Sequence, residues 1–205
     1  KDGYFEAFTR EWAPIEDMRL SDKDANESKT MNTHLHVLEA YTCLYRVWKS
    51  SLLEERLRGL ISIFEDKILG TDGHLKLFFD DDWNCNYDIF SYGHDIEASW
   101  LIHEAALVLG DPEVLERIEK IVPHIAEAAS EGFTPEGGMI YERVGEEIDR
   151  DRHWWVQAES VVGYFNLWDH FGSRKDLENA LMCWDFIKAN IIDKENGEWF
   201  WSVRA

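Results

Sequence analysis

The sequence repeats one short element four times. In each copy a glycine is followed by alternating aromatic and aliphatic residues, and the copies recur at intervals of roughly 60–70 residues. Each copy is predicted to be a short strand entered through a turn, because glycine favours turns and aromatic residues favour strands. The four copies begin at Gly3, Gly73, Gly138 and Gly197.

Each interval between these copies contains two segments whose apolar residues recur at helical spacing. Gly110 and Gly172 directly follow the first segment of the second and third intervals, and a glycine is the residue that commonly ends a helix. Each repeat is therefore a strand element followed by two helices. The predicted helices cover residues 30–48, 52–69, 94–109, 113–131, 153–171 and 175–191.

Such a repeat cannot bury its apolar face alone, so it must stack on copies of itself. The copies can form an open α-solenoid or a closed α/α barrel of inner and outer helices. Helical solenoids have shorter periods, typically about 33–47 residues, so the longer period and the hairpins favour the barrel. A barrel needs about six pairs. The predicted fold is therefore all-α, a partial (α/α)6 barrel of about three helix pairs joined by short β-hairpins, with residues 1–205 as a single domain of roughly half a barrel.

Composition and charge exclude several classes of partner. The formal net charge is −20, which argues against nucleic acid and against an anionic membrane surface, and it is compatible with a neutral ligand. Ten Trp, seven Tyr and eleven Phe serve mostly as core, but a surplus of aromatic faces also favours carbohydrate. No apolar run reaches about 18 residues, so no membrane span is predicted.

The cysteines indicate the compartment. Cys43, Cys85 and Cys183 are odd in number and widely spaced, so neither a disulfide framework nor a zinc site is predicted, and a cytoplasmic location is favoured. The chain shows no signal peptide. It begins without Met and stops after an aromatic run, so both ends are interpreted as internal to a longer protein.

Polar and aromatic residues gather at the start of the first helix of each repeat. In a barrel the inner-helix N-termini converge on one mouth, so these side chains are expected to surround one pocket. Their spacing by three and four residues is compatible with one helical face in each repeat. His103, His124 and His170 have no such neighbours and are interpreted as structural or surface residues. The gathered residues are Asn32, His34 and His36; His94, Asp95, Glu97 and Trp100; and His153, Trp154, Trp155, Gln157 and Glu159.

Four segments together carry a resemblance to a known family. Residues 30–36 with 39–41, the run Gly-His-Asp-Ile-Glu-Ala-Ser-Trp at 93–100, residues 153–159 and the loop 17–24 resemble cellobiose 2-epimerases. These segments lie in order and span nearly the whole chain. The wider family includes N-acylglucosamine 2-epimerases and aldose–ketose isomerases, and the run at 93–100 is more similar to the disaccharide branch.

The resemblance implies a reaction and a role for each site residue. The reducing sugar opens, the C2 proton is removed, and a proton returns to the other face through an enediolate, with no metal or nucleotide cofactor. His94 matches a general acid/base, and an imidazole has a suitable pKa for that work. Glu97 matches its orienting partner. The matched substrate contacts are Asn32 and His36 on the reducing-end sugar, Trp100 and Trp155 as stacking residues, and Glu159 as a polar contact.

The sequence also departs from the family pattern. The family's second catalytic histidine would follow the last glycine element, and its substrate-polarising arginine would precede residue 1, so neither has a match. The complete protein is predicted to be a sugar epimerase, whereas the activity of these 205 residues alone stays open. Three alternatives also stay open: an N-acylglucosamine 2-epimerase or aldose–ketose isomerase, a glycoside hydrolase using Glu97 and Glu159, and a non-catalytic sugar-binding module. The sequence does not indicate an oligomeric state.

Overall fold

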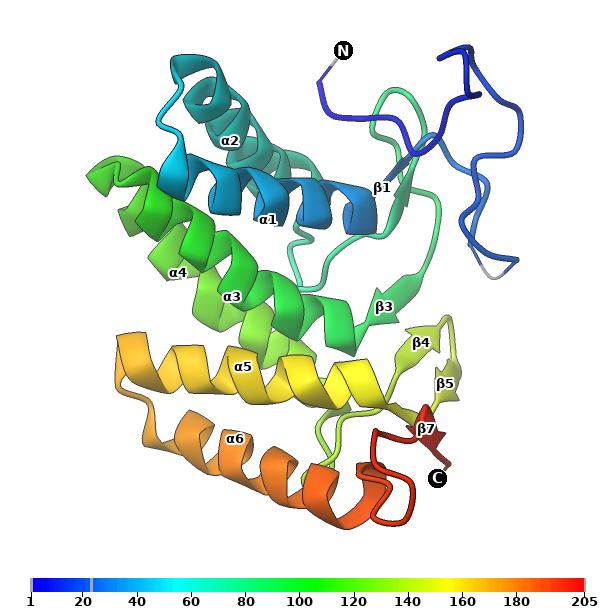
Figure 1. Ribbon diagram of the computed structural model, residues 1–205, viewed down its shortest axis with the longest axis vertical. Helices are drawn as coiled ribbons and strands as arrows, with labels where there is room; N and C mark the ends of the chain where they lie inside the picture. The colour runs from blue at the N-terminus through cyan, green and yellow to red at the C-terminus, as the bar shows by residue number, and fades with distance from the viewer. Residues whose placement is uncertain (1, 23, 205) are drawn as a thin grey trace.

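A computed structural model describes residues 2–22 and 24–204, and its α-helices form three consecutive pairs (Figure 1). The first helix of each pair lies in one layer, in which α3 packs against both α1 and α5. The second helix of each pair covers the outside of this layer. The pairs are α1 (Met31–Val47) with α2 (Ser51–Ile63), α3 (Tyr92–Leu109) with α4 (Pro112–Ala129), and α5 (Trp154–Phe171) with α6 (Arg174–Phe186).

Local signals in the sequence set the helix ends. Asp111 caps α4 by accepting hydrogen bonds from the backbone of Glu113 and Val114, directly before a proline at the first helical position. At the other ends of α3 and α5, Gly110 and Gly172 adopt left-handed φ angles of 76° and 71°. The outer helices then tighten or widen in their last turn: α2 and α6 continue as π-helical turns at Phe64–Ile68 and Ile187–Ile191, and α4 continues as a 3₁₀ turn at Ser130–Gly132.

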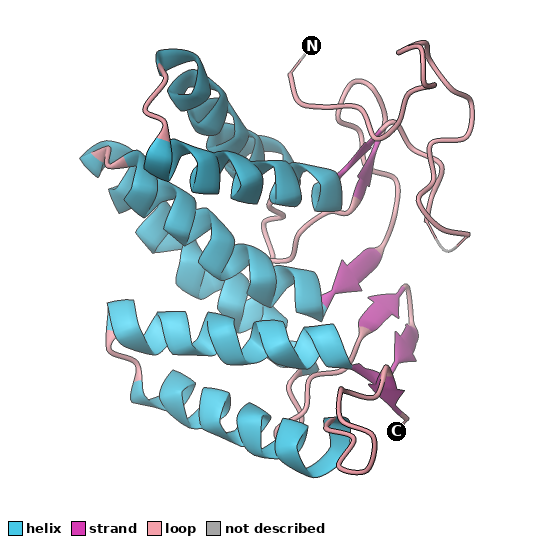
Figure 2. Ribbon diagram, in the orientation of Figure 1, coloured by secondary structure: helices cyan, strands magenta, loops and turns pink. Residues whose placement is uncertain are grey.

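The strands all lie at one edge of the helix layer (Figure 2). A short strand leads directly into each inner helix and pairs antiparallel with a strand from later in the chain. Each inner helix is thus held at its N-terminus by the following repeat. The pairs are β1 (Lys29–Thr30) with β2 (Phe78–Phe79), β3 (Ile89–Ser91) with β4 (Glu142–Val144) and through it β5 (Glu147–Asp149), and β6 (Arg152–His153) with β7 (Ser202–Val203).

The prediction that every glycine element is a strand is only partly right. The second copy contains β2, whereas the third and fourth copies contribute single bridges at Met139 and Trp199, and β7 begins directly after the fourth copy. The first copy forms no strand, because its backbone is bonded elsewhere: the Tyr4 N–H donates to His34, and the Glu6 N–H donates to the Ser28 carbonyl.

The fourth residue of each inner helix is a buried anchor. In all three repeats its side chain accepts a hydrogen bond from a backbone N–H just after a turn glycine, so it fixes the helix on the segment that follows this glycine. Gln157 shows the fullest version, since its amide also donates to the carbonyls of Met139 and His153. The three anchoring bonds are Tyr4 N to His34 Nε2 at 3.0 Å, Leu75 N to Asp95 Oδ1 at 2.9 Å, and Met139 N to Gln157 Oε1 at 2.8 Å.

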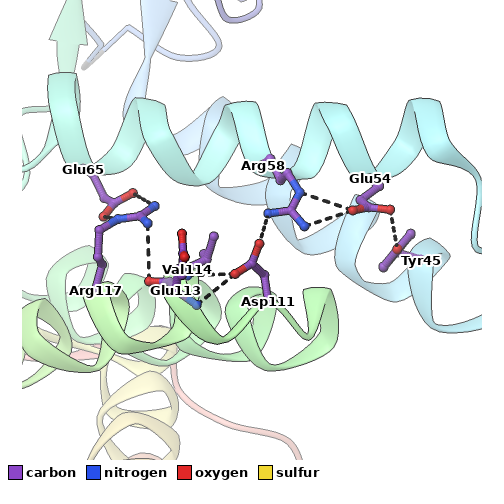
Figure 3. Close-up of polar contacts among 8 residues, drawn as sticks. All are labelled: Tyr45, Glu54, Arg58, Glu65, Asp111, Glu113, Val114 and Arg117. Carbon is purple, nitrogen blue, oxygen red and sulfur yellow. Dashed lines mark hydrogen bonds and ion pairs between the residues drawn. The ribbon is translucent and has the colours of Figure 1, made fainter.

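Ion pairs join the outer helices α2 and α4 across the back of the layer (Figure 3). The Arg58 guanidinium lies between Glu54 of its own helix and the capping carboxylate Asp111, and Arg117 forms a two-pronged pair with Glu65 at 3.0 and 3.2 Å. These pairs are partly exposed, so they connect two repeats while adding little stability. Within the described residues, no helix is both long and apolar enough to cross a membrane.

Candidate functional site

The sixth residue of each inner helix faces the same point. These residues are His36 of α1, Glu97 of α3 and Glu159 of α5. The three helices lie side by side with their N-termini at the same edge, so equivalent positions come together (Figure 1). His36 Nε2 is 4.0 Å from Glu97 Oε1, and the charge of Glu159 acts on Glu97. In each inner helix the fourth residue therefore anchors the fold, whereas the sixth residue contributes to a face that the three helices share.

The two carboxyl groups of this face hold protons unusually tightly. Burial raises the pKa of Glu97 to about 8, and the negative charges of Glu159 and Glu39 contribute to this shift. Burial also raises the pKa of Glu159, although the Trp100 indole N–H, donating to it at 2.9 Å, opposes the shift. Glu97 is therefore a neutral acid near pH 7, able to donate a hydrogen bond as well as accept one.

His94, the third residue of α3, is held from two sides. Its Nδ1 is 2.7 Å from the Ser91 hydroxyl, and its ring packs against the indole of Trp155 with ring centroids 4.8 Å apart. Burial lowers the pKa of His94 to about 4, with a smaller contribution to this shift from the neighbouring His36. The imidazole is therefore neutral at physiological pH, which is the state that can accept a proton.

The predicted pairing of His94 with Glu97 is not what the structure contains. Ser91 is bonded to the His94 ring instead. The physical reason is the direction of helical side chains, which lean toward the helix N-terminus and so bring His94 back onto Ser91. Glu97, one turn further along, approaches His36 of the neighbouring helix.

A small cavity adjoins His94. Its volume is about 80 Å³, and Asn32, Phe78 and His94 line it together with the loop that precedes β1. That loop supplies Arg19 and Asp24, so the segment singled out at 17–24 does lie at this place, although its Lys23 falls outside the described residues. A much larger hollow of about 760 Å³ lies between α1 and α2 and contains none of the predicted site residues.

The family model described as N-acylglucosamine 2-epimerase (GlcNAc 2-epimerase) matches residues 4–205. The chain belongs to this family. A cellobiose 2-epimerase from Bacteroides fragilis is 61% identical to the chain over 208 residues, covering 100% of the chain and 53% of that protein. A cellobiose 2-epimerase from Ruminococcus albus is 41% identical, covering 98% of the chain and 52% of that protein.

A solved structure of similar sequence agrees with the fold described above. A sugar epimerase from a ruminal bacterium superposes with a TM-score of 0.94 at 41% identity, over 98% of this chain and 52% of that one. The predicted all-α, helical-barrel class is thereby confirmed. The chain spans about half the length of the relatives it matches.

Other candidates from the sequence lie outside the shared face. His34, Asp95 and Gln157 are the three anchors, and His153 is buried in a stack on Tyr141, with ring centroids 4.1 Å apart. Trp154 is 39% exposed and lies beside Trp199. These residues are of the same types as the residues of the shared face and lie close to them in the sequence, but their side chains point in other directions.

The histidines predicted to be structural also lie elsewhere. His103 is buried near the other end of α3, where it is hydrogen bonded to Asn166 of α5 and contacts the ring of His170. The sequence interpretation missed two residues of the site, Ser91 and Glu39. Both lie three residues from a predicted histidine, Ser91 before His94 and Glu39 after His36, and Glu39 also lies in a segment that carries the resemblance. Among the residues that the structure describes, no three His, Cys, Asp or Glu groups are placed to hold a metal ion.

Proposed function

We propose that the complete protein is a sugar 2-epimerase acting at the reducing end of β-1,4-linked disaccharides and converting cellobiose to glucosyl-mannose. The observation that carries this proposal is the environment of His94, a neutral imidazole beside a cavity that Asn32 also lines. Near neutral pH this imidazole is in the unprotonated form, which is the form that can accept a proton from carbon. The cellobiose 2-epimerases that match nearly the whole chain support the choice of substrate.

In this proposal His94 and Glu97 act on the reacting atoms of the opened sugar. The Nε2 atom of His94 takes the proton from C2, and the electrons of that bond form the enediolate. Glu97, which keeps a proton near neutral pH, donates a hydrogen bond to the C1 oxygen, on which negative charge develops. A proton delivered to the opposite face of C2 then gives the epimer, and a second acid/base in the rest of the protein supplies it.

The other residues of the face bind the sugar. Asn32 and His36 contact the reducing-end unit, and the rings of Trp100 and Trp155 stack on the C–H faces of the disaccharide. Glu159 is held by the Trp100 indole at 2.9 Å, so its remaining oxygen is oriented to accept from a sugar hydroxyl. We propose a neutral disaccharide as the partner and no nucleic acid, given the net charge of −20. The three cysteines are free, which favours a cytoplasmic location.

The test is proton NMR of the complete protein with cellobiose in deuterated water. Epimerisation replaces the C2 proton with deuterium, so the C2 signal is lost while signals of the mannose configuration appear. Persistence of the C2 signal would exclude the proposal. The same mixture separates the alternatives, because glycoside hydrolysis adds the mass of water and aldose–ketose isomerisation gives a ketose carbon signal.

A further inference from the structure

Ser91 directly precedes α3. The equivalent residue is Thr30 before α1 and His153 before α5. The Thr30 hydroxyl caps α1 by accepting a hydrogen bond from the Thr33 N–H at 3.1 Å. Serine is among the preferred residues for such a cap, yet the Ser91 hydroxyl makes no capping bond to α3. It lies 2.7 Å from His94 Nδ1 instead. The Ser91 hydroxyl, which could have capped α3, therefore contacts the His94 side chain.

Both partners of this bond are fixed in place. Ser91 is only 2% exposed, and it lies in β3, where it pairs with Glu142 of β4. His94 is one turn into α3, and its ring is packed against Trp155. The position of the hydroxyl relative to Nδ1 is therefore set by a strand register and a helix start, and not by a mobile loop.

The bond distinguishes the two ring nitrogens of His94. Among the described residues, Ser91 is the hydrogen-bond partner of this ring, and it contacts Nδ1. Nε2 is then the nitrogen left for a ligand in the cavity that His94 and Asn32 line. Which nitrogen carries the proton in a neutral histidine depends on the hydrogen bond that the other nitrogen makes.

We propose that Ser91 is a positioning residue that keeps a proton on Nδ1 of His94, so that Nε2 carries the exchangeable lone pair. This rests on the proposed function. Before the reaction the Nδ1–H donates to the Ser91 oxygen. Nε2 then takes the C2 proton, which makes an imidazolium with a proton on each nitrogen, and the Nδ1–H bond to Ser91 is unchanged. The second acid/base protonates C2 from the opposite face, and the Nε2 proton of His94 is then released to water, which restores the starting tautomer.

A hydroxyl at this position acts differently from a carboxylate. It accepts from Nδ1–H both before and after proton uptake, so no tautomer change accompanies the reaction. It is also uncharged, whereas a carboxylate would stabilise the imidazolium and raise the pKa of the ring. The neutral partner is consistent with the burial-lowered pKa of His94, which stays at about 4. An imidazolium formed on the enzyme is then a strong acid, ready to release its proton.

The first test needs no substrate. The complete protein, labelled with ¹⁵N-histidine, is studied by long-range ¹H–¹⁵N NMR at pH 7, and the His94 signals are assigned by their loss in His94→Asn. The Nδ1–H tautomer is expected to dominate in the wild type. Ser91→Ala is expected to give a mixture of tautomers, and Ser91→Thr, which keeps the hydroxyl, is expected to restore the wild-type pattern. A dominant Nε2–H tautomer in the wild type, or an unchanged pattern in Ser91→Ala, would overturn the proposal.

The second test is kinetic. Loss of a hydrogen bond to a group that becomes charged should lower kcat of Ser91→Ala roughly ten- to a hundredfold, with KM changed by less than about threefold. Ser91→Thr should recover most of kcat. The matched control is Ser173→Ala, which removes the capping hydroxyl of the outer helix α6 and should leave kcat near the wild-type value. A wild-type kcat in Ser91→Ala would overturn the positioning role. Absence of epimerisation by the wild type would overturn the proposed function, whereas the tautomer measurement would still decide the role of Ser91.

Discussion

His36 Nε2 lies 4.0 Å from Glu97 Oε1, although 61 positions of sequence separate the two residues and they belong to different repeats. Each is the sixth residue of an inner helix, and Glu159 occupies the same position in the third repeat. Because α1, α3 and α5 lie side by side, these equivalent positions come together and the three motifs form one face (Figure 1). The electrostatic coupling within that face leads to the first two predictions.

Replacing Glu159 with Gln should lower the pKa of Glu97 from about 8. Burial is the main cause of the raised value and persists in the variant, so the pKa should fall only part of the way toward the ordinary range. The negative charge of Glu159 is the next contributor, and the amide removes it. The measurement is a pH titration of ¹³C-labelled glutamate side chains by NMR. Glu146→Gln, in an exposed turn, is the control, and an equal shift there would contradict the coupling.

Glu97 should also make stability fall as pH rises between about 4.5 and 8. In that window the folded chain keeps a proton on Glu97 that the unfolded chain has released, so raising the pH favours unfolding. The contribution has a slope of at most about 1.4 kcal/mol per pH unit. Urea unfolding at several pH values should show the stability advantage of the wild type over Glu97→Gln shrinking across this window. An advantage that grows with pH would show that Glu97 is ionised in the folded protein.

The helices were the most predictable part of this structure. The second inner helix was expected at residues 94–109 and covers Tyr92–Leu109, because its apolar spacing and the glycine at 110 are local signals. The strand expected in the first glycine element is absent, since a strand needs a partner and the sequence does not show where that partner lies. The gathering of polar residues at the helix starts was also predictable from the sequence.

The sequence could not separate site residues from anchors. His34 and His36 are two residues apart in the same helix, yet the first accepts a hydrogen bond from the backbone N–H of Tyr4 and the second approaches Glu97. The difference depends on how α1 is rotated against its neighbours, which only tertiary packing decides. The bond between Ser91 and His94 was hidden for the same reason, because it depends on the direction in which a side chain leaves the helix.

The anchor role of Gln157 can be tested through stability. Gln157 is fully buried and makes three hydrogen bonds to backbone groups of Met139 and His153. Gln157→Leu leaves the N–H and carbonyl of Met139 without this partner in the interior, which should cost roughly 3 kcal/mol of unfolding free energy. Urea denaturation measures the loss. Asn190→Leu, at an exposed position, is the control and should stay within about 0.5 kcal/mol of the wild type.

The last prediction concerns His94 in the complete protein. His94→Asn should lower kcat by about 10²–10⁴-fold while KM changes little, because Asn has a similar volume and hydrogen-bonding groups but cannot exchange a proton near pH 7. Glu97→Gln should be milder, since the amide is neutral and donates a hydrogen bond, as the protonated carboxyl does. The control is His103→Asn, nine residues further along α3 and therefore roughly 14 Å from the level of His94 along the helix axis. Its side chain binds Asn166, so a loss of stability is expected there, but not a selective loss of kcat in the folded fraction. Near-normal turnover in His94→Asn, or equal damage to kcat in His103→Asn, would show that the catalytic base lies elsewhere.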